Sequence, residues 1–141
     1  MLRFKIAIGC LIIALAMQMG AQDIAKSHVE GNVPEAKDFA RILLRDLRGK
    51  FCHTEKCKLT YELLRKGATQ TGISYPKFYV WVVTKDGSKQ QSGAVRLEAI
   101  DKDHFEISGY LPAEKIRKAP EQVAAVFPAP LVKGIVERAA H

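Results

Sequence analysis

The first 21 residues constrain this chain most, because they predict the compartment in which the rest of it folds. Two basic residues, Arg3 and Lys5, precede an unbroken apolar run over residues 6–17. The small residues Gly20 and Ala21 follow this run. A basic start, a short apolar run and a small-residue end are typical of a secretory signal peptide. We therefore expect residues 1–21 to be cleaved off, leaving a periplasmic or secreted protein in a compartment where thiols oxidise.

Two other interpretations of this leader can be weighed against cleavage. An uncleaved membrane anchor needs about 20 consecutive apolar residues, whereas Gln18 and Gly20 interrupt this run after roughly a dozen. A cysteine that carries a lipid should end the apolar run, but Leu11 follows Cys10 and continues it. We expect Cys10 to leave with the leader and the mature protein to have no stable membrane anchor.

The mature chain of about 120 residues is long enough for one domain and too short for two. Residues 22–33 are polar and without periodicity, so we expect a flexible mature N-terminus followed by a single domain over residues 34–141. The full chain has a formal charge of +7, of which Arg3 and Lys5 contribute two, which leaves +5 after cleavage. The basic residues are spread along the sequence, which predicts a soluble basic surface. Nucleic-acid-binding motifs are absent from the sequence, so nucleic acid is not an expected partner.

Two cysteines, Cys52 and Cys57, remain in the mature chain, and an oxidising compartment favours a disulfide between them. Cα atoms five residues apart in a helix lie roughly 8 Å from each other, beyond the limit of about 7 Å for a disulfide. A helix therefore cannot contain both cysteines. Thr54 is a suitable N-cap, so we expect a helix over residues 55–66 that ends at Gly67. The disulfide would then fasten the preceding loop to the start of this helix.

Another helix is expected to open at Pro34, because proline is tolerated in the first helical turn, and to end at Gly49. Apolar residues recur at spacings of three and four between Ala36 and Leu47, which predicts one buried face. The opposite face carries a basic row that is either a docking face for an acidic partner or a solvated helix surface. This row consists of Lys37, Arg41, Arg45 and Arg48.

The pattern changes to β after residue 76. Residues 78–84 are rich in β-branched and aromatic side chains, residues 86–91 supply turn and loop chemistry, and further strands are expected over residues 93–100 and 104–110. The fold class is therefore α+β, with two N-terminal helices, a three-stranded antiparallel meander and short C-terminal helices, the helices forming one layer on the sheet. The C-terminal helices are expected to begin at prolines, namely Pro112, Pro120 and Pro130.

The last two strands have a preferred register, because a shift by one residue would set apolar against polar side chains. One face of this pair then belongs to the core. The first strand has apolar residues on both faces, so its second face needs a cover, which is a helix of the same chain, a partner chain or a ligand. The expected pairs are Ile100–His104, Ala99–Phe105, Leu97–Ile107 and Val95–Gly109, which leaves Arg96, Glu98, His104, Glu106, Ser108 and Tyr110 on the other face.

This register places Glu98 opposite Glu106, with their Cβ atoms roughly 5 Å apart. Two carboxylates at that distance can share acid and base roles, as in a retaining glycosidase, and His104 lies nearby in the sequence. The alternative is a solvated sheet face on which the two side chains diverge beside Arg96. A chain this small has little room for a substrate cleft, and it carries no assembled catalytic motif, so binding is favoured over catalysis.

Aromatic residues suggest a binding surface on the same sheet. Tyr79, Trp81 and Tyr110 are expected to share a face with Arg96 and His104, a mixture typical of surfaces that bind sugars or peptides. The alternative is that helices of the same domain cover these rings, because aromatic residues in strands are usually buried.

A metal site would have to combine Cys52, Cys57 and His53 with the distant His28 or His104. No second pair of cysteines or histidines follows the first at a regular interval, as a zinc site would require. A disulfide is therefore favoured, and neither a metal nor another cofactor is expected.

The segment from Cys52 to Cys57 presents His53 and Glu55 in a short loop. Over these six residues it is similar to the C-x4-C loop that bacterial periplasmic inhibitors of vertebrate-type lysozymes insert into the cleft of the enzyme. The resemblance implies contact roles for His53 and Glu55. It covers no other part of the chain, and the helices expected here differ from that mostly β family.

Together these features predict an exported, non-enzymatic binding protein that acts on a protein or glycan partner of the cell envelope. An inhibitor, an immunity factor or an envelope accessory protein would fit. The expected contact surface is either the sheet face with Trp81 or the loop between the two cysteines. The alternatives are a small hydrolase that uses Glu98 and Glu106, and a structural envelope protein that forms a homodimer through its sheet.

Overall fold

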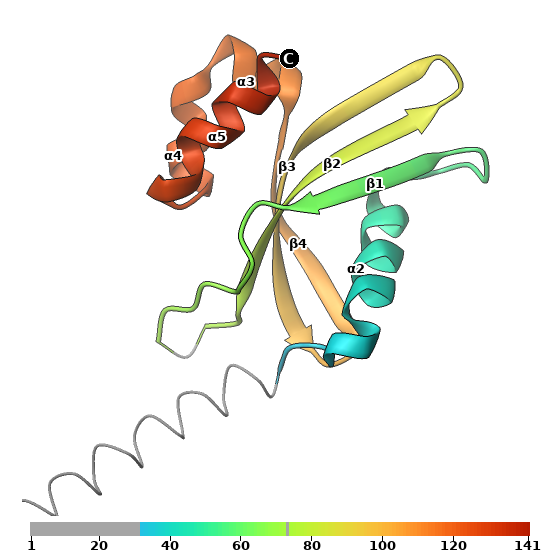
Figure 1. The fold of residues 1–141 in the computed structure, drawn as a ribbon, viewed down its shortest axis with the longest axis vertical. Coiled ribbons are helices and arrows are strands. Elements are labelled where there is room, and N and C mark those ends of the chain that lie inside the picture. Colours follow the sequence, from blue (N-terminus) through green and yellow to red (C-terminus); the bar gives the residue numbers. More distant parts are fainter. Residues whose placement is uncertain (1–31, 73) are drawn as a thin grey trace, which may run out of the picture. The chain divides into compact units, whose positions relative to one another are not determined.

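The computed structural model describes residues 32–72 and 74–141, and residues 32–141 form one unit (Figure 1). The expected signal peptide, Cys10, His28 and all but the last two residues of the expected flexible segment lie outside the described residues. The order of elements is α2 (Ala36–Phe51), β1 (Lys58–Leu63), β2 (Lys77–Asp86), β3 (Lys89–Asp101), β4 (His104–Pro112), α3 (Ala113–Lys118), η1 (Pro120–Gln122), α4 (Val123–Val126) and α5 (Ala129–Ala139).

Helix α2 confirms the expected N-terminal helix, but it begins two residues after Pro34 and continues beyond Gly49 to Phe51. A single glycine costs about 1 kcal/mol relative to alanine inside a helix, which is too little to end one whose apolar face is well packed. The chain leaves the helix at Cys52, whose backbone is extended. The residues of α2 that are fully buried are Ile42, Leu43 and Leu47.

The helix expected over residues 55–66 is wrong, because residues 58–63 form the strand β1. In this segment Leu59 and Tyr61 alternate with polar residues, which is the period of a strand with one buried face. Both side chains pack into the cluster that contains α2. The sheet therefore has four strands where the sequence predicted three, and the fold remains α+β.

The sheet is fully antiparallel, with the strand order β1-β2-β3-β4. Only Gly87 and Ser88 connect β2 to β3, and Gly87 adopts a φ of 63°, in the left-handed region that glycine enters without strain. Such a tight hairpin keeps both strands paired up to the turn. For this reason β3 begins at Lys89, where the sequence predicted a loop up to residue 91 and a strand only from Gly93.

The expected register between β3 and β4 is confirmed in its middle and wrong at both ends. The pairs Leu97–Ile107, Glu98–Glu106 and Ala99–Phe105 are as predicted, whereas shifts next to Leu97 and Ala99 place Asp101 opposite His104 and Tyr110 opposite Val95. A shift of one residue turns a side chain to the other face of the sheet.

Two clusters of buried side chains lie on opposite faces of β2, because its successive residues point to opposite sides. Phe78, Val80 and Val82 pack with α2, whereas Tyr79 and Trp81 pack with the C-terminal helices. Figure 1 shows α2 and the C-terminal helices on different sides of the strands. Helices thus contact both faces, where the sequence predicted a single layer on one of them. The cover that β2 needs comes from the chain itself.

The C-terminal helices begin where the prolines predicted. Pro112 is the N-cap of α3, Pro120 opens η1, and Pro130 lies in the first turn of α5. Their buried residues include Ile116, Val123 and Ile135, which cover Tyr79 and Trp81. Among the described residues no helix combines the length and the apolar character needed to cross a membrane.

Candidate functional site

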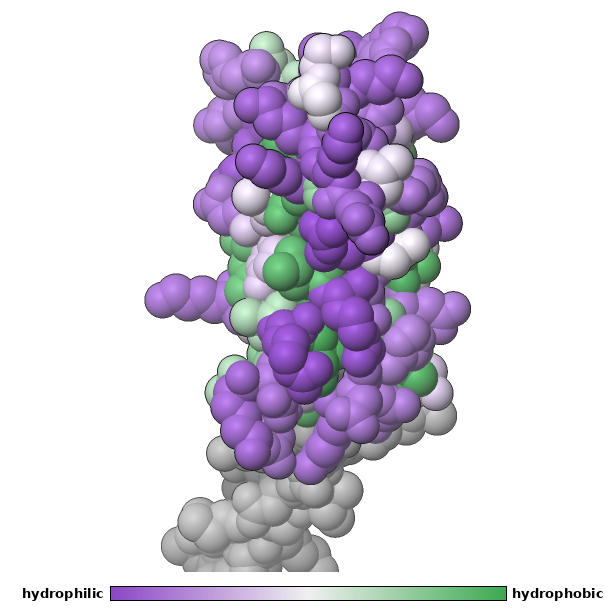
Figure 2. Space-filling model, turned by 90° about the vertical axis from the view of Figure 1, so that its right-hand side faces the viewer, coloured by the Kyte–Doolittle hydropathy of each residue, from purple (hydrophilic) through white to green (hydrophobic). Residues whose placement is uncertain are grey.

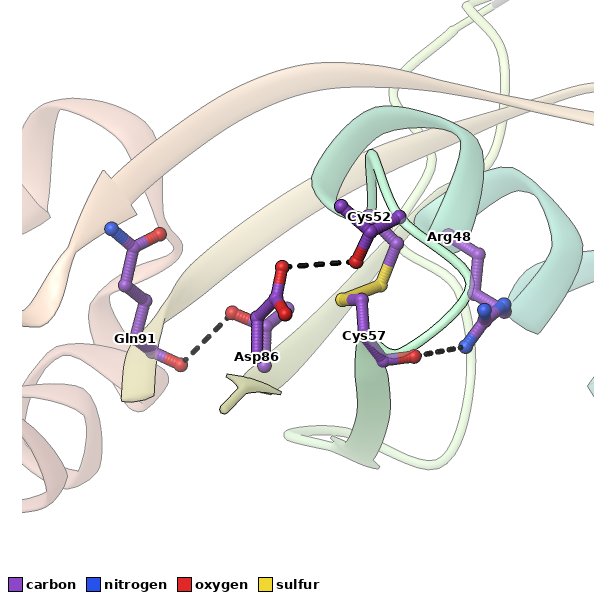
Figure 3. Close-up of a disulfide and its surroundings, with 7 residues drawn as sticks. Arg48, Cys52, Cys57, Asp86 and Gln91 are labelled. Atoms are coloured by element: carbon purple, nitrogen blue, oxygen red, sulfur yellow. Dashed lines mark hydrogen bonds between the residues drawn. A yellow bond between two sulfur atoms is a disulfide. The ribbon is translucent and has the colours of Figure 1, made fainter. Parts of the chain in front are cut away.

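The disulfide between Cys52 and Cys57 is present, with Cα atoms 5.6 Å apart (Figure 3). It joins the residue that ends α2 to the residue before β1. The prediction that it fastens a loop to the start of a helix is wrong, because β1 occupies the place of that helix. We call residues 52–57 the disulfide loop. It reverses the chain between the buried face of α2 and the edge strand of the sheet.

Three polar contacts hold the disulfide loop in addition to the covalent bond, and Figure 3 draws the one between Arg48 and Cys57 and the one that Asp86 accepts. Arg48 Nη1 donates to the carbonyl oxygen of Cys57 at 3.1 Å. The backbone N–H of Cys57 donates to the carbonyl oxygen of Thr54 at 3.3 Å. Thr54 Oγ1 donates to Asp86 Oδ2 at 3.0 Å, so Thr54 links the loop to the β2–β3 turn and does not cap a helix. The loop is therefore fixed at both ends and in its middle.

The four residues between the cysteines, 53–56, are all exposed. His53, Glu55 and Lys56 present an imidazole, a carboxylate and an ammonium group within four positions. Figure 2 views the side on which, in Figure 1, the α2–β1 connection and the β2–β3 turn lie, and this side is largely hydrophilic with a small apolar area near its middle. Lys58 and Lys85 lie directly opposite each other in neighbouring strands at this end of the molecule.

Glu98 and Glu106, the predicted carboxylate pair, come from strand positions that lie opposite each other, but their side chains have different surroundings. Glu98 lies opposite Glu106, but Glu98 Oε1 is 3.9 Å from Lys77 Nζ. Glu106 and His104 line an open groove of about 560 Å³ beside α2, and Glu98 is not among the residues that line it. His104 Nδ1 lies 3.7 Å from Asp46 Oδ2, on the side of α2. The three candidate catalytic residues therefore do not converge on this groove.

Asp46 is a residue that no pattern in the sequence singles out. Its Oδ2 accepts a hydrogen bond from the backbone N–H of Phe105 at 2.8 Å, and its Oδ1 accepts one from Arg45 Nε at 2.9 Å. The hydrogen bond and the charge of Asp46 raise the pKa of Arg45 further above its usual range. Asp46 thus fastens α2 to the start of β4.

The basic row of α2 is largely engaged with groups of the same chain. Lys37 pairs with Glu35 at 3.6 Å and Arg41 with Asp38 at 3.3 Å. Arg45 pairs with Asp46, and Arg48 binds the carbonyl oxygen of Cys57. These contacts describe a solvated helix surface, the second of the two interpretations of this row.

Tyr79 and Trp81 do not form an open aromatic surface. Their exposed fractions are 3% and 8%, because the C-terminal helices cover them. The hydroxyl groups of Tyr79 and Thr69 lie within hydrogen-bond distance, 2.6 Å, and the Tyr79 ring packs against Phe127 with centroids 6.0 Å apart. The rings therefore serve the core.

Arg96, expected on a binding surface, is used inside the fold. Its Nε and Nη2 donate to the Oγ and the carbonyl oxygen of Ser108, at 3.0 and 2.8 Å, and its Nη1 donates to the carbonyl oxygen of Val126 at 3.1 Å. Arg96 therefore links β3 to the irregular part of β4 and to α4. Its Nε, Nη1 and Nη2 are all engaged in hydrogen bonds within the fold.

Tyr110 lies on the face of the sheet opposite to the one expected, because of the register shift next to Leu97. Its ring packs edge-on against Phe51 with centroids 4.8 Å apart, and burial raises the pKa of its hydroxyl. It also lines an open polar groove of about 550 Å³ at the end of β4. Tyr110 thus borders a groove, whereas Tyr79 and Trp81 are buried.

Among residues 32–72 and 74–141, no group of three histidine, cysteine or acidic side chains is placed to hold a metal ion. Cys52 and Cys57 are bonded to each other.

Comparison with protein-family models finds no matching family, and comparisons with curated proteins and with solved structures find no match.

Proposed function

We propose that this protein is an exported, non-enzymatic binding protein that contacts a protein or glycan of the cell envelope through its disulfide loop. The observation that carries the proposal is the combination of exposure and rigidity in this loop. Residues 53–56 are exposed, while the Cys52–Cys57 bond and the contact between Thr54 and Asp86 fix the backbone that presents them.

Rigidity of this kind supports binding, because a loop that is already ordered loses little conformational entropy when it meets a partner. The side chains of His53, Glu55 and Lys56 are exposed and offer donors, an acceptor and charges of both signs. Such mixed chemistry suits recognition of polar groups on a partner. It is also the segment that resembles the contact loop of lysozyme inhibitors.

The proposed location follows from the leader and the disulfide together. Residues 1–21 carry the three parts of a signal peptide, and a disulfide persists in oxidising compartments such as the periplasm or the extracellular space. A disulfide closing so short a loop adds only about 2 kcal/mol. The proposal is therefore that the bond shapes a contact loop more than it supports the core.

The test is binding of the mature protein to a solubilised envelope fraction, measured as retention on immobilised protein and analysed for both proteins and glycans. The charge reversals Glu55→Lys and Lys56→Glu are each expected to reduce retention of the bound component by at least tenfold. Glu137→Lys on α5 and Lys102→Glu at the β3–β4 turn are matched controls, because both residues are exposed and lie outside the loop. Unchanged retention in the loop variants, or turnover of an envelope glycan, would contradict the proposal.

A further inference from the structure

One stretch of the sheet has a strand neighbour on one side only. β3 begins at Lys89, but its pairing with β4 begins at Gly93, which lies opposite Pro112. Residues 89–92 therefore extend beyond the end of β4 and pair with β2 alone. We call residues 89–92 the β3 overhang. Beyond Pro112 the chain turns into α3, so no strand among residues 32–72 and 74–141 pairs with the overhang on the β4 side.

The backbone N–H and C=O groups of the overhang point alternately toward β2 and away from it. Thr84 Oγ1 on β2 donates to the carbonyl oxygen of Gln91, so this carbonyl points toward β2. Successive residues of a strand direct their N–H and C=O groups to opposite edges. The backbone groups of Gln90 and Ser92 therefore point away from β2. Within residues 32–72 and 74–141 no strand pairs with them on that side.

A groove of about 550 Å³ runs along this open edge. The overhang forms one side, the end of β4 another, and the first turns of α3 a third, whereas no residue of β2 lines it. Glu114 and Arg117 of α3 supply charges of opposite sign. The side chains that line the groove and bear polar groups are Gln90, Gln91, Ser92, Tyr110, Glu114 and Arg117.

The Tyr110 ring in this groove is held in place from two sides. Phe51 packs edge-on against it. On the other side the ring lies so close to Gly93 that a Cβ there would come within 2.6 Å of Tyr110 Cε2. The glycine thus allows the ring to stand directly against β3. A fixed aromatic side chain offers contact area at little entropic cost.

Apart from Lys89 at its first position, the overhang lacks the devices that usually protect the edge of a sheet. Natural edges carry lysines, prolines or bulges that prevent another strand from pairing with them. Lys58 and Glu62 lie in the edge strand β1, and the edge strand β4 has irregular pairing at two points. Residues 90–92 are Gln, Gln and Ser, without a charge, a proline or a register shift.

We propose that the β3 overhang and its groove bind an extended peptide segment of a protein partner, which pairs as an added strand with the backbone of Gln90 and Ser92. A peptide is the occupant favoured by the structure, because the free N–H and C=O groups of a strand edge are complementary to another peptide backbone. The opposite charges of Glu114 and Arg117 leave the groove without a preference for polyanions. The inference rests on the proposed function only in that the partner is a protein, and it concerns a different surface.

The first test uses the unmodified mature protein and a library of capped octapeptides. The tightest binder is then resynthesised with each backbone amide N-methylated in turn. Pairing with Gln90 and Ser92 predicts that methylation weakens binding about tenfold at two peptide amides spaced two residues apart, and has little effect at the amide between them. Absence of any binding peptide, or a loss without this spacing, would overturn the proposal.

The second test changes the protein. Ser92→Pro removes an N–H that points into the groove and is not part of the pairing with β2, so it is expected to weaken the same octapeptide at least tenfold. Lys102→Ala, at an exposed position in the β3–β4 turn outside the groove, is the control. Glu55→Lys should leave octapeptide binding unchanged, so failure of the loop proposal and failure of this one are distinguishable. If the protein sediments as a dimer with the Gln90 and Ser92 amides protected from hydrogen exchange, the occupant is a second copy and the peptide proposal is wrong.

Discussion

Arg96 on β3 and Val126 on α4 are joined by a hydrogen bond of 3.1 Å from the guanidinium Nη1 to the backbone carbonyl oxygen. Through its other donors the same guanidinium binds Ser108 where the pairing of β4 shifts. One side chain thus connects two strands and the C-terminal helices. This explains why a basic residue that the sequence placed on a binding surface is half-buried and engaged with the fold.

Replacing this side chain should destabilise the protein. Arg96→Met removes three hydrogen bonds from a charged donor and leaves the carbonyl oxygens of Ser108 and Val126 without their partner. We expect the free energy of unfolding to fall by about 2 kcal/mol, measured by urea denaturation. Lys115→Met is the control, because Lys115 is exposed on α3. Equal effects of the two substitutions would show that Arg96 does not connect these elements.

Removal of the disulfide should loosen the loop without unfolding the sheet. The double variant Cys52→Ala, Cys57→Ala is expected to lose about 2 kcal/mol, the value for closing a loop this short. Far-ultraviolet circular dichroism should remain that of an α+β protein. Amide hydrogen exchange should accelerate at residues 53–56, while β2 keeps its protection. A global loss of β2 protection would show that the bond supports the core and not mainly the loop.

Two glycines should respond in opposite directions to alanine. A Cβ at Gly93 would meet the carbonyl oxygen of Leu111 and the Tyr110 ring, each at 2.6 Å. Gly93→Ala is therefore expected to cost about 1–3 kcal/mol through overpacking. Gly134 lies inside α5, where a Cβ would have no neighbouring atom within 4 Å, so Gly134→Ala should stabilise the protein by about 0.5–1 kcal/mol. Thermal unfolding of the two variants measures the contrast, and a shift of the same sign in both would contradict it.

The ion pair between β1 and α5 should make stability depend on pH. Arg138 contacts both carboxylate oxygens of Glu62 at 2.8 Å, and its hydrogen bond and charge lower the pKa of Glu62. A carboxylate with a lowered pKa stabilises the folded state above its unfolded pKa of about 4.3, and this contribution is lost as pH falls through the folded value.

The expected result is a stability difference between the wild type and Glu62→Gln that is present at pH 7 and disappears in acid. The difference should also shrink at high ionic strength, because both groups are near the surface. Glu137→Gln, at an exposed position on the same helix, should show no such trend. A difference between wild type and Glu62→Gln that is constant from pH 7 to pH 2 would exclude the ion pair as its source.

Local patterns in the sequence predicted an element correctly where they are compatible with only one kind of secondary structure. α2, the tight bend at Gly87 and the proline-initiated helices each depend on residues close together in the chain. β1 was missed because Cys57, Tyr61 and Leu64 also fit the spacing of a helix. Its strand conformation depends on pairing with β2, about twenty residues away.

The candidate site was also predicted only where it depends on residues close together in the chain. The disulfide was predicted from two nearby cysteines and the expected oxidising compartment, both of which depend on short stretches of sequence. The face on which Tyr110 lies depends on a one-residue shift that Arg96 stabilises from another strand. Asp46 acts on Phe105, 59 positions along the chain, and no local pattern reports such a contact.

The most direct test of the proposed contact surface is covalent trapping of the partner at the disulfide loop. A photo-crosslinking amino acid is placed at position 55 in the full-length protein, and at position 102 as the exposed control. On irradiation of intact cells, we predict a discrete adduct with one envelope component from position 55 and none from position 102. No adduct from position 55, or the same adduct from both positions, would contradict the claim that this loop is where the protein meets its partner.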